Sequence, residues 1–540
     1  MIGKGFNTAA PFLATFTAAL LIAWCVLPQQ SAAQRAFMEG APDLMRSTGA
    51  NANALVASPF GILNNSIANL NAENGSIWVG PFLNFSNDEG ASWYRPETDS
   101  LFGTTNRLFS IDMDGDVIVA GIGRNDVVGG QGIQTAAGFL ISEDGGLSFQ
   151  YRYPQLDGPE DDTEVYGVSV LPALPVIVPQ QSPPFDIDYE PNRGELWVAG
   201  WASGVRKSKD LGRTWSRVVL PPDNLDVISP EIPYSFSVEP QRGSNGSLNH
   251  MGFSVLVDRQ GLVWAGTAGG LNVSTDSGLA WRRFKANGTS QSLTGNWIIS
   301  LEEQVTTTPS TIWAASWNTG ESGGSAGQYG VSILENGGDS IRQTLLGEKV
   351  YDFAFDGNTT YVAGDNGLFI SKDGGKSWDS ISQFKESGGA NRVVRPHSSV
   401  FSVEVDAGIL WVGTSDGLLR SENGGRSWTI LHVNVPLHPE QSSSSVPDVD
   451  TYAYPNPFSR GDDSFVRIKY EASTASGGTI RIFDFGMNVV RELKVEFQNG
   501  VNESMWDGMN SSGIPVPNGT YFYEVNAGSS RFRGKILVIE

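Results

Sequence analysis

Two short apolar patterns alternate along most of the chain. The first ends in small residues, as in residues 76–80 (Ser-Ile-Trp-Val-Gly) and 262–266 (Leu-Val-Trp-Ala-Gly). Corresponding segments lie at 117–121, 195–200, 311–315, 360–364 and 409–413. A shorter apolar segment, such as 270–274, follows the first within each unit. Short apolar runs bounded by glycine and polar residues predict β-strands rather than helices.

An eight-residue pattern, Ser-x-Asp/Asn-x-Gly-x-Ser/Thr-Trp, comes next in each unit, and we call it the eight-residue box. Six good copies end at residues 93, 149, 215, 281, 378 and 428, and a decayed copy spans 334–341. The Asp or Asn position is held by Asp88, Asp144, Asp210, Asp276, Asp373 and Asn423, and the aromatic position in five copies by Trp93, Trp215, Trp281, Trp378 and Trp428. We expect the Asp or Asn side chain to accept hydrogen bonds from backbone amides two residues on, and the glycine to supply positive φ. The Trp should open the next strand and be buried between neighbouring sheets.

The boxes recur about every 56 residues, which is typical of a radial repeat. Each unit therefore predicts a four-stranded antiparallel blade. We predict an all-β chain in which seven blades form a β-propeller over about residues 60–433, followed by a small immunoglobulin-like β-sandwich.

The boxes resemble the Asp-box, or bacterial neuraminidase repeat, of sialidases, sortilin-type receptors, xyloglucanase-type hydrolases and photosystem II assembly factors. Residues 292–301 also resemble the propeller repeats of two-component sensors. The resemblance implies the fold but no single activity, because the same box occurs in enzymes and in binding proteins. Sialidase activity is not expected, because the Arg-Ile-Pro motif of that family occurs nowhere in the chain.

The N-terminus has the pattern of an export signal. Lys4 supplies a positive charge, residues 11–27 are apolar and uncharged, and Ser31-Ala32-Ala33 provides the small residues that a signal peptidase requires. We predict a signal peptide over 1–33 and an N-terminal lead over 34–59. The single cysteine, Cys25, lies inside the signal peptide, so disulfides are not expected in the mature chain.

After the seventh unit the composition changes. Residues 434–450 are rich in serine and proline and predict a linker. Residues 451–540 begin near Tyr454-Pro455-Asn456-Pro457-Phe458 and alternate short strands with Gly and Asn turns. This module resembles the FlgD-like immunoglobulin domain that serves as a C-terminal sorting signal in type IX secretion. The resemblance implies delivery to the outer cell surface or medium, with the outer-membrane secretion machinery as a partner.

Composition and scattered motifs exclude several classes of function. A net charge of −22 disfavours nucleic-acid binding. The four histidines lack metal-ligand spacing, and residues 112–116 (Asp-Met-Asp-Gly-Asp) lack the later glutamate of an EF-hand, so we expect no metal and no cofactor. Two Gly-x-Ser-x-Gly sequences, at 413–417 and 320–324, are interpreted as a hairpin turn and a loop rather than a nucleophile elbow.

Loop lengths indicate where a ligand would bind. The boxes are short, whereas connections between strands two and three (122–137 and 316–330) and between blades (151–184, 220–250 and 384–398) are long. Both long types emerge at the sheet edge opposite the boxes, which is typical of a recognition surface. Candidate binding residues there are Trp201, Trp317, Asp161, Glu164 and Glu321.

The leading hypothesis is a monomeric, non-catalytic, secreted or cell-surface protein that binds an extracellular glycan or protein; no catalytic residue is assigned. The first alternative is a secreted glycoside hydrolase or lyase that uses Asp161, Glu164 or Glu321 across the central cleft. A structural component of the cell surface is the second alternative.

Overall fold

The computed structural model describes residues 51–52, 55–58, 61–96, 105–240, 246–305, 310–317, 328–387, 392–433, 437, 449–460, 463–473 and 476–539. The predicted signal peptide and most of the N-terminal lead lie outside these residues, as does most of the predicted linker. Across the described residues the chain is almost entirely β, with two 3₁₀ turns, η2 (Leu248–His250) and η3 (Asn336–Gly338). No helix among these residues is long and apolar enough to cross a membrane.

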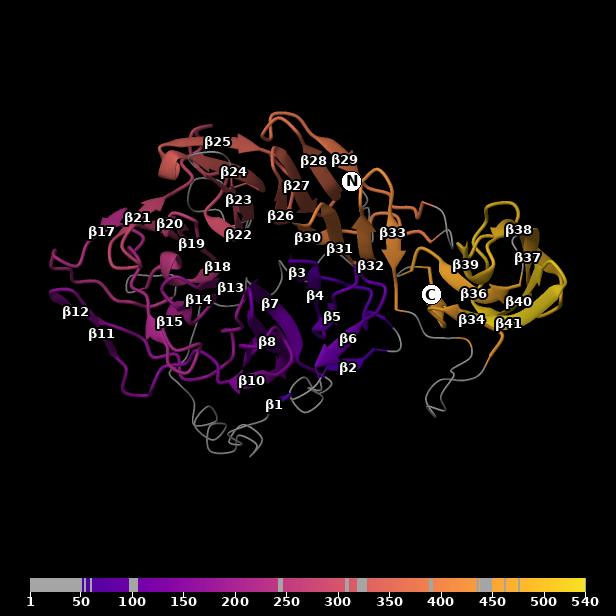
Figure 1. Ribbon diagram of the computed structural model, residues 1–540, viewed down its shortest axis with the longest axis horizontal. Helices are drawn as coiled ribbons and strands as arrows, with labels where there is room; N and C mark the ends of the chain where they lie inside the picture. Colours follow the sequence, from indigo (N-terminus) through magenta and orange to yellow (C-terminus); the bar gives the residue numbers. More distant parts are fainter. Residues whose placement is uncertain are drawn as a thin grey trace, which may run out of the picture.

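Among the described residues, seven antiparallel sheets stand around a ring, and in each sheet four strands follow one another in chain order from the inside outwards (Figure 1). This arrangement confirms the predicted seven-bladed propeller. Blade one consists of β3 (Leu70–Glu73), β4 (Ser76–Val79), β5 (Asn84–Ser86) and β6 (Tyr94–Pro96). Blade two consists of β7 (Arg107–Asp114), β8 (Val117–Val128), β9 (Gln131–Ser142) and β10 (Phe149–Arg152). Blade three consists of β13 (Asp186–Glu190), β14 (Glu195–Gly200), β15 (Gly204–Ser208) and β16 (Ser216–Arg217). Blade four consists of β18 (Gly252–Val257), β19 (Val263–Thr267), β20 (Gly270–Ser274) and β21 (Trp281–Phe284).

Blade five consists of β22 (Trp297–Gln304), β23 (Thr311–Trp317), β24 (Gly330–Glu335) and β25 (Ser340–Thr344). Blade six consists of β26 (Val350–Asp356), β27 (Thr359–Gly364), β28 (Gly367–Ser371) and β29 (Asp379–Ile381). Blade seven is β30 (Val400–Asp406), β31 (Ile409–Thr414), β32 (Gly417–Ser421) and β33 (Thr429–Leu431). Short outer strands add to three blades: β1 (Asn51–Ala52) pairs with β10, β2 (Leu55–Ala57) with β6, and β17 (Val227–Ile228) with β21. A separate ribbon, β11 (Thr163–Tyr166) and β12 (Ser169–Pro172), follows blade two in sequence and lies outside blades three and four, where Tyr166 donates to the carbonyl of Leu279 at 2.6 Å (Figure 1).

The ring closes where blade seven meets blade one, and no strand among the described residues is shared between the two sheets. The amide of Ile67 donates to the carbonyl of Thr414 at 2.9 Å, and Asp406 accepts from the amides of Asn74 and Gly75. One buried cluster, which includes Trp93 and Trp411, draws on both blades. Closure therefore rests on side-chain packing and hydrogen bonds between the first and last repeats.

Each eight-residue box is a hydrogen-bonded turn between the third and fourth strands of its blade. In blade one, Asp88 Oδ1 accepts from the amide of Ser92, four residues on, at 2.8 Å, while Ser86 Oγ accepts from the amides of Asp88 and Gly90. The other five good copies repeat the bond from the amide four residues on. The expectation that the Asp side chain accepts from the amide two residues on was wrong. The amide of Gly90, two residues after Asp88, donates to Ser86 Oγ instead, and the Asp88 carboxylate accepts from the amide four residues on.

The box glycine lies against the preceding blade. Gly146 of blade two has φ of +88°, and a Cβ there would stand 2.2 Å from the indole of Trp78 in blade one. Gly278 and Gly375 have the same relation to Trp197 and Trp313. The glycine therefore permits both the left-handed turn and the close contact between blades.

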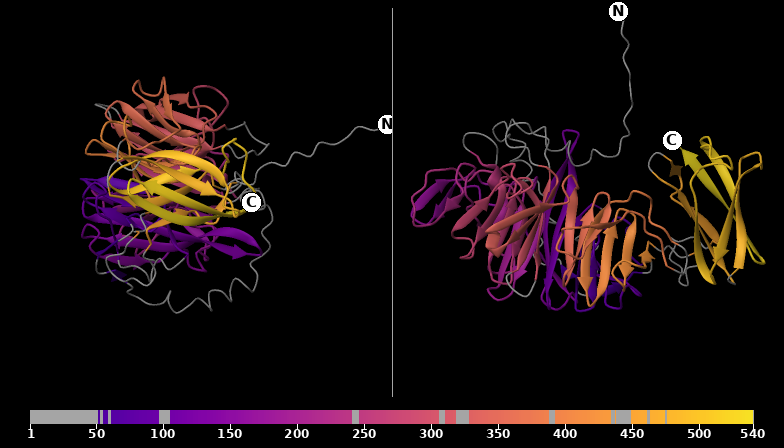
Figure 2. Two further views of the ribbon diagram at one scale, coloured as in Figure 1. Left: turned by 90° about the vertical axis from the view of Figure 1, so that its right-hand side faces the viewer. Right: turned by 90° about the horizontal axis from the view of Figure 1, so that it is seen from above.

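The C-terminal module is a β-sandwich beside the propeller (Figure 2). One sheet has the order β34 (Thr451–Tyr454), β36 (Val466–Ala472), β39 (Gly500–Trp506). The other has the order β35 (Phe458–Ser459), β41 (Ser530–Ile539), β40 (Gly519–Ala527), β37 (Ser476–Phe483), β38 (Val489–Phe497). Their facing sides bury an apolar core that includes Phe458, Tyr470 and Trp506.

The motif around Tyr454 fastens the last strand to this sandwich. Asn456 Nδ2 donates to the carbonyl of Lys535 at 3.0 Å, and Asn456 Oδ1 accepts from the amide of Leu537 at 2.9 Å. Phe458 is fully buried and pairs in parallel with Val538. The motif thus has a structural role in holding β41.

The sandwich contacts blade seven directly. The guanidinium of Arg467 bonds Asp416, in the turn between β31 and β32, and donates to the carbonyl of Val393 at 3.3 Å. Its Nε lies 3.2 Å from Glu503 Oε1. This turn contains one of the Gly-x-Ser-x-Gly sequences, and the structure shows it to be a two-residue hairpin, with Thr414 paired with Gly417.

Candidate functional site: the central channel

The first strands of the seven blades surround a central channel. β3, β7, β13, β18, β22, β26 and β30 all contribute residues to its wall, and the space they enclose is about 700 Å³. These strands are the innermost of their sheets in Figure 1. A cavity of this size falls within the range of sites that bind small molecules or short segments of a larger ligand.

A β-bulge recurs near the start of five first strands. The pairing register shifts by one residue at Phe109, Phe253, Ile299, Tyr351 and Phe401, each of which is left out of the ladder. Phe185 stands at the same level, just before β13. A bulge turns the unpaired side chain away from the sheet, and all of these residues except Phe253 line the channel.

The aromatic side chains at this level contact one another from blade to blade. Ring centroids are 6.4 Å apart for Phe109 and Phe185, 6.1 Å for Phe185 and Phe253, and 5.2 Å for Phe253 and Trp297. Trp201 packs on Phe253 and Trp297 at 5.1 and 5.2 Å.

A second chain joins Trp317 to Tyr351 at 5.5 Å and Tyr351 to Phe401 at 5.3 Å. We call these two chains the aromatic mouth; it comprises Phe109, Phe185, Trp201, Phe253, Trp297, Trp317, Tyr351 and Phe401.

The structure places two predicted binding residues, Trp201 and Trp317, in the aromatic mouth, where they pack on other aromatic rings, but neither lines the channel itself. Both are half-buried and packed, and the Nε1 of Trp317 donates to the carbonyl of Val350 at 2.8 Å. Both lie at or just after the end of a second strand, and the bulges lie near the start of first strands. In an antiparallel meander these ends share one sheet edge, which is the edge opposite the boxes.

Eight acidic residues line the channel wall, and we call six of them the channel carboxyls: Asp112, Asp186, Asp188, Glu302, Asp352 and Glu404. Several join neighbouring blades. Asp186 and Asp188 accept from the amides of Val255 and Val257 at 2.9 and 3.0 Å. Asp112 and Asp352 accept in the same way from Tyr189 and Val403 of the next blade.

Two of the channel carboxyls, Glu302 and Glu404, accept hydrogen bonds through only one of their two oxygens. Glu302 Oε1 and Glu404 Oε1 each accept from the amide of the residue that follows, at 3.1 Å. Their other oxygens accept no hydrogen bond from the residues that the structure describes. These oxygens are the ones that a ligand in the channel can reach without displacing a bond between blades.

Burial is the largest cause of a raised pKa at all six channel carboxyls. It raises the pKa of Asp186 and of Glu404 to about 8, and that of Asp112 and of Asp352 to about 7. The pKa values of Asp188 and Glu302 also lie well above the ordinary range, because repulsion from Asp112 and Glu404, respectively, adds to burial. The negative charge of the channel therefore increases as pH rises through neutrality.

Replacing both glutamates with glutamine (Glu302→Gln, Glu404→Gln) should stabilise the propeller at alkaline pH. The folded chain holds the Glu404 proton up to about pH 8, whereas the ordinary pKa is 4.5. The stability that this group contributes is fully present below about pH 4.5 and is lost as pH rises towards 8. We expect the variant to gain about 2 kcal/mol at pH 8.5, allowing for water in the channel, and almost nothing at pH 5. Denaturant unfolding at the two pH values measures this, and an equal gain at both would contradict the assignment.

The structure places the predicted acidic binding residues elsewhere. Asp161 Oδ2 accepts from the amide of Gly158 at 2.6 Å within a loop, and Glu164 lies 3.3 Å from the guanidinium of Arg217. Neither lines the channel, and Glu321 is outside the described residues. Asp161 and Glu164, two of the acids proposed for catalysis, therefore do not face each other across the central channel.

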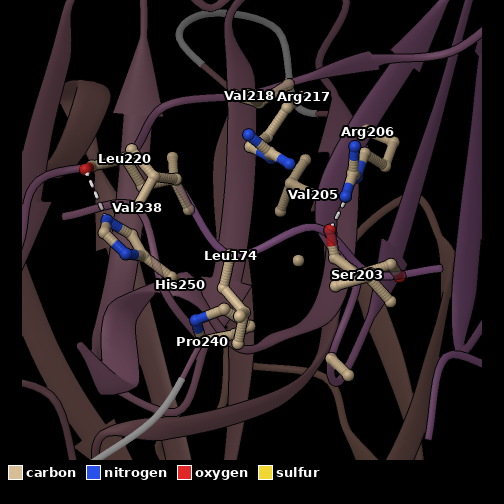
Figure 3. A pocket seen from close by; sticks show the side chains of 13 residues that line it. Leu174, Ser203, Val205, Arg206, Arg217, Val218, Leu220, Val238, Pro240 and His250 are labelled. Carbon is tan, nitrogen blue, oxygen red and sulfur yellow. Dashed lines mark hydrogen bonds between the residues drawn. The ribbon is translucent and has the colours of Figure 1, made fainter. Parts of the chain in front are cut away.

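Glu164 belongs to an ion-pair group on blade three. Asp157 bonds the buried guanidinium of Arg206 and that of Arg217, and both arginines border a small cavity of about 20 Å³ (Figure 3). His250, on another side of this cavity, donates from Nε2 to the carbonyl of Leu220 at 3.0 Å. The space suits about one water molecule, so this group has a structural role in fixing the 153–162 loop.

Sequence reasoning missed the channel carboxyls and the bulges. A four-residue sequence pattern could have indicated them, because it occurs at the start of four first strands. The pattern is an aromatic or apolar residue, then Ser or Asp, then an apolar residue, then an acidic residue. It occurs as Phe109-Ser-Ile-Asp, Phe185-Asp-Ile-Asp, Ile299-Ser-Leu-Glu and Phe401-Ser-Val-Glu. Within the part of the chain that the structure describes, no three His, Cys, Asp or Glu side chains form a group that could hold a metal ion.

Comparisons with known proteins find a family match at the C-terminus. Residues 458–531 match the FlgD Ig-like domain. No curated protein matches the chain.

Among solved structures, the chain is similar to PorZ, described as a surface component of the type-IX secretion system of Porphyromonas gingivalis. The identity is 12% and the TM-score 0.34, over 88% of this chain and 81% of that one. It is also similar to a GH74 enzyme of Niastella koreensis (13%, TM-score 0.46, 88% and 73% of the two chains) and to YCF48 from Cyanidioschyzon merolae (14%, 0.38, 68% and 98%). At these identities and TM-scores, function has to be argued from the chain's own residues.

Proposed function

We propose that the protein is an exported, non-catalytic recognition protein that binds an extracellular glycan or protein at the aromatic mouth of its channel. The observation that carries this proposal is the pair of aromatic chains at one channel opening. Four of the eight rings, those of Phe109, Phe185, Tyr351 and Phe401, are half-buried and border the channel, so a ligand can stack on them. They lie at the sheet edge from which the long connections emerge, and these connections extend the surface around the opening.

Export to the cell surface or medium is part of the proposal. It rests on the signal-peptide pattern over 1–33 and on the C-terminal domain, which matches the FlgD Ig-like family. We propose that this domain is a type IX sorting domain and that the outer-membrane secretion machinery recognises it. The boxes, with a Ser-Asp hydrogen bond in five good copies and a Ser-Asn bond in the sixth, support assignment of the propeller to the Asp-box repeats.

Glycoside hydrolysis is the second candidate. The observation that favours it is the raised pKa of Asp186 and Glu404, because a general acid must hold its proton near neutral pH. Turnover of a polysaccharide that disappears in Glu404→Gln would establish this candidate and overturn the non-catalytic proposal.

A glycan array and a panel of extracellular proteins, probed with the mature chain and two double variants, test the proposal. Tyr351→Ala with Phe401→Ala removes part of the aromatic mouth, where the two rings are 5.3 Å apart. Phe485→Ala with Phe522→Ala removes a comparable pair, 6.3 Å apart, from the C-terminal sandwich. We expect the first variant to bind at least ten times more weakly and the second to bind normally. Equal binding by both variants would show that the ligand does not use the mouth.

A further inference from the structure

The channel wall is strongly unbalanced in charge. Besides the six channel carboxyls, Glu73 and Glu303 line it, and among the described lining residues Arg259 is the only cation. Glu303 is nine-tenths buried; its Oε2 accepts from the amide of Arg259, while its Oε1 has no hydrogen-bond partner among the described residues. A cationic ligand would supply the missing donors and the opposite charge.

The aromatic mouth already holds an ammonium group. Lys349 Nζ lies 4.2 Å from the centre of the Trp317 ring and 5.1 Å from that of Tyr351. These distances are those of cation–π contacts. The contact shows that these rings attract a cation, so an incoming lysine or arginine side chain would displace Lys349 or stack on the other rings of the mouth on its way to the carboxyls.

The spacing of the carboxyls matches an extended peptide. Asp186 and Asp188 are two residues apart on one strand, so their side chains point the same way about 6.6–6.8 Å apart. Alternate side chains of an extended ligand chain have the same spacing. Basic residues at every second position would meet carboxyls at two depths of the channel.

We infer that the channel binds an extended, lysine- or arginine-bearing peptide segment, which enters through the aromatic mouth and places its cationic groups on the channel carboxyls. This inference rests on the proposed function and names the ligand class for the same site. Glu302 and Glu404 are the first carboxyls to be engaged, because each has an oxygen that accepts no hydrogen bond from the described residues.

Fluorescence anisotropy with fluorescein-labelled pentalysine, at near-physiological salt and pH 8, tests the inference. The chain's net charge of −22 attracts any polycation, so a matched control is needed. Glu302→Gln with Glu404→Gln removes two channel carboxyls. Glu160→Gln with Asp162→Asn removes two charges from an exposed outer loop. We expect the channel variant to bind at least ten times more weakly, the loop variant to change by less than twofold, and acetylated pentalysine not to bind.

Equal weakening in the two variants would overturn the inference, because it would trace binding to the overall charge. Absence of pentalysine binding, together with a ligand that depends on Tyr351 and Phe401, would also overturn it and leave the proposed function standing. If no ligand of the glycan array or protein panel depends on Tyr351 and Phe401, and pentalysine binding does not depend on Glu302 and Glu404, both proposals fail. Unchanged thermal unfolding of the channel variant at pH 5 establishes that it is folded.

Discussion

Replacing Gly146 with alanine is expected to destabilise the propeller by about 2–5 kcal/mol. The residue has φ of +88°, which costs an alanine about 1–2 kcal/mol. The new methyl would also stand 2.2 Å from Cζ2 and 2.6 Å from Cη2 of Trp78. Trp78 is fully buried, so one of the two blades must move, and overpacking of this kind adds about 1–3 kcal/mol. Denaturant unfolding followed by tryptophan fluorescence measures the loss.

The neighbouring glycine of the same box provides the control. Gly145 also has positive φ, +68°, but a Cβ there meets only Asp116 Oδ1, at 3.5 Å. Gly145→Ala should therefore cost only about 1–2 kcal/mol, and the difference between the two variants isolates the contact with Trp78. Equal losses at both positions would show that the box glycine serves the turn alone.

The propeller could be predicted from sequence because its strongest signals are local and repeated. Each box needs a serine, an Asp or Asn, a glycine and an aromatic residue within eight positions, and these make their hydrogen bonds with one another. The Trp of the second strand recurs for the same reason, since it packs on the next blade's box. One detail of the turn was wrong, because Asp and Ser compete for the same amides and sequence alone does not show which amide each accepts.

The channel could not be found in this way because its residues are far apart in sequence. Glu302 and Glu404 lie on blades five and seven and repel each other across the space that ring closure creates. The bulges that expose Tyr351 and Phe401 depend on strand pairing, and neither residue differs in type from a core aromatic. Trp201 and Trp317 were selected from their place after strand two, but only the structure shows their partners at the mouth.

Arg467→Ala is expected to release the C-terminal sandwich from blade seven. The guanidinium is almost fully buried and bonds Asp416 of the propeller while it pairs with Glu503 of its own domain. His432 lies beside this pair, with Nε2 donating to the carbonyl of Asp416 at 2.9 Å; burial and the charge of Arg467 lower its pKa, so it is neutral at pH 7. Without Arg467, two buried carboxylates lose their main cation, which costs about 3–5 kcal/mol. Small-angle scattering should show a larger radius of gyration.

Two further variants separate release of the domain from its unfolding. Asp416→Ala alters only the propeller side and leaves Arg467 paired with Glu503, so we expect a smaller effect of the same sign, with the sandwich folded. Arg533→Ala removes an exposed arginine that pairs with Glu524 on the same sandwich, and it should leave the scattering unchanged because exposed pairs contribute little. A compact Arg467→Ala chain would mean that other contacts hold the domains together. Asp416 lies in the hairpin at 413–417, which resembles a nucleophile elbow in sequence. A change in the scattering of Asp416→Ala would therefore also assign that motif to domain docking.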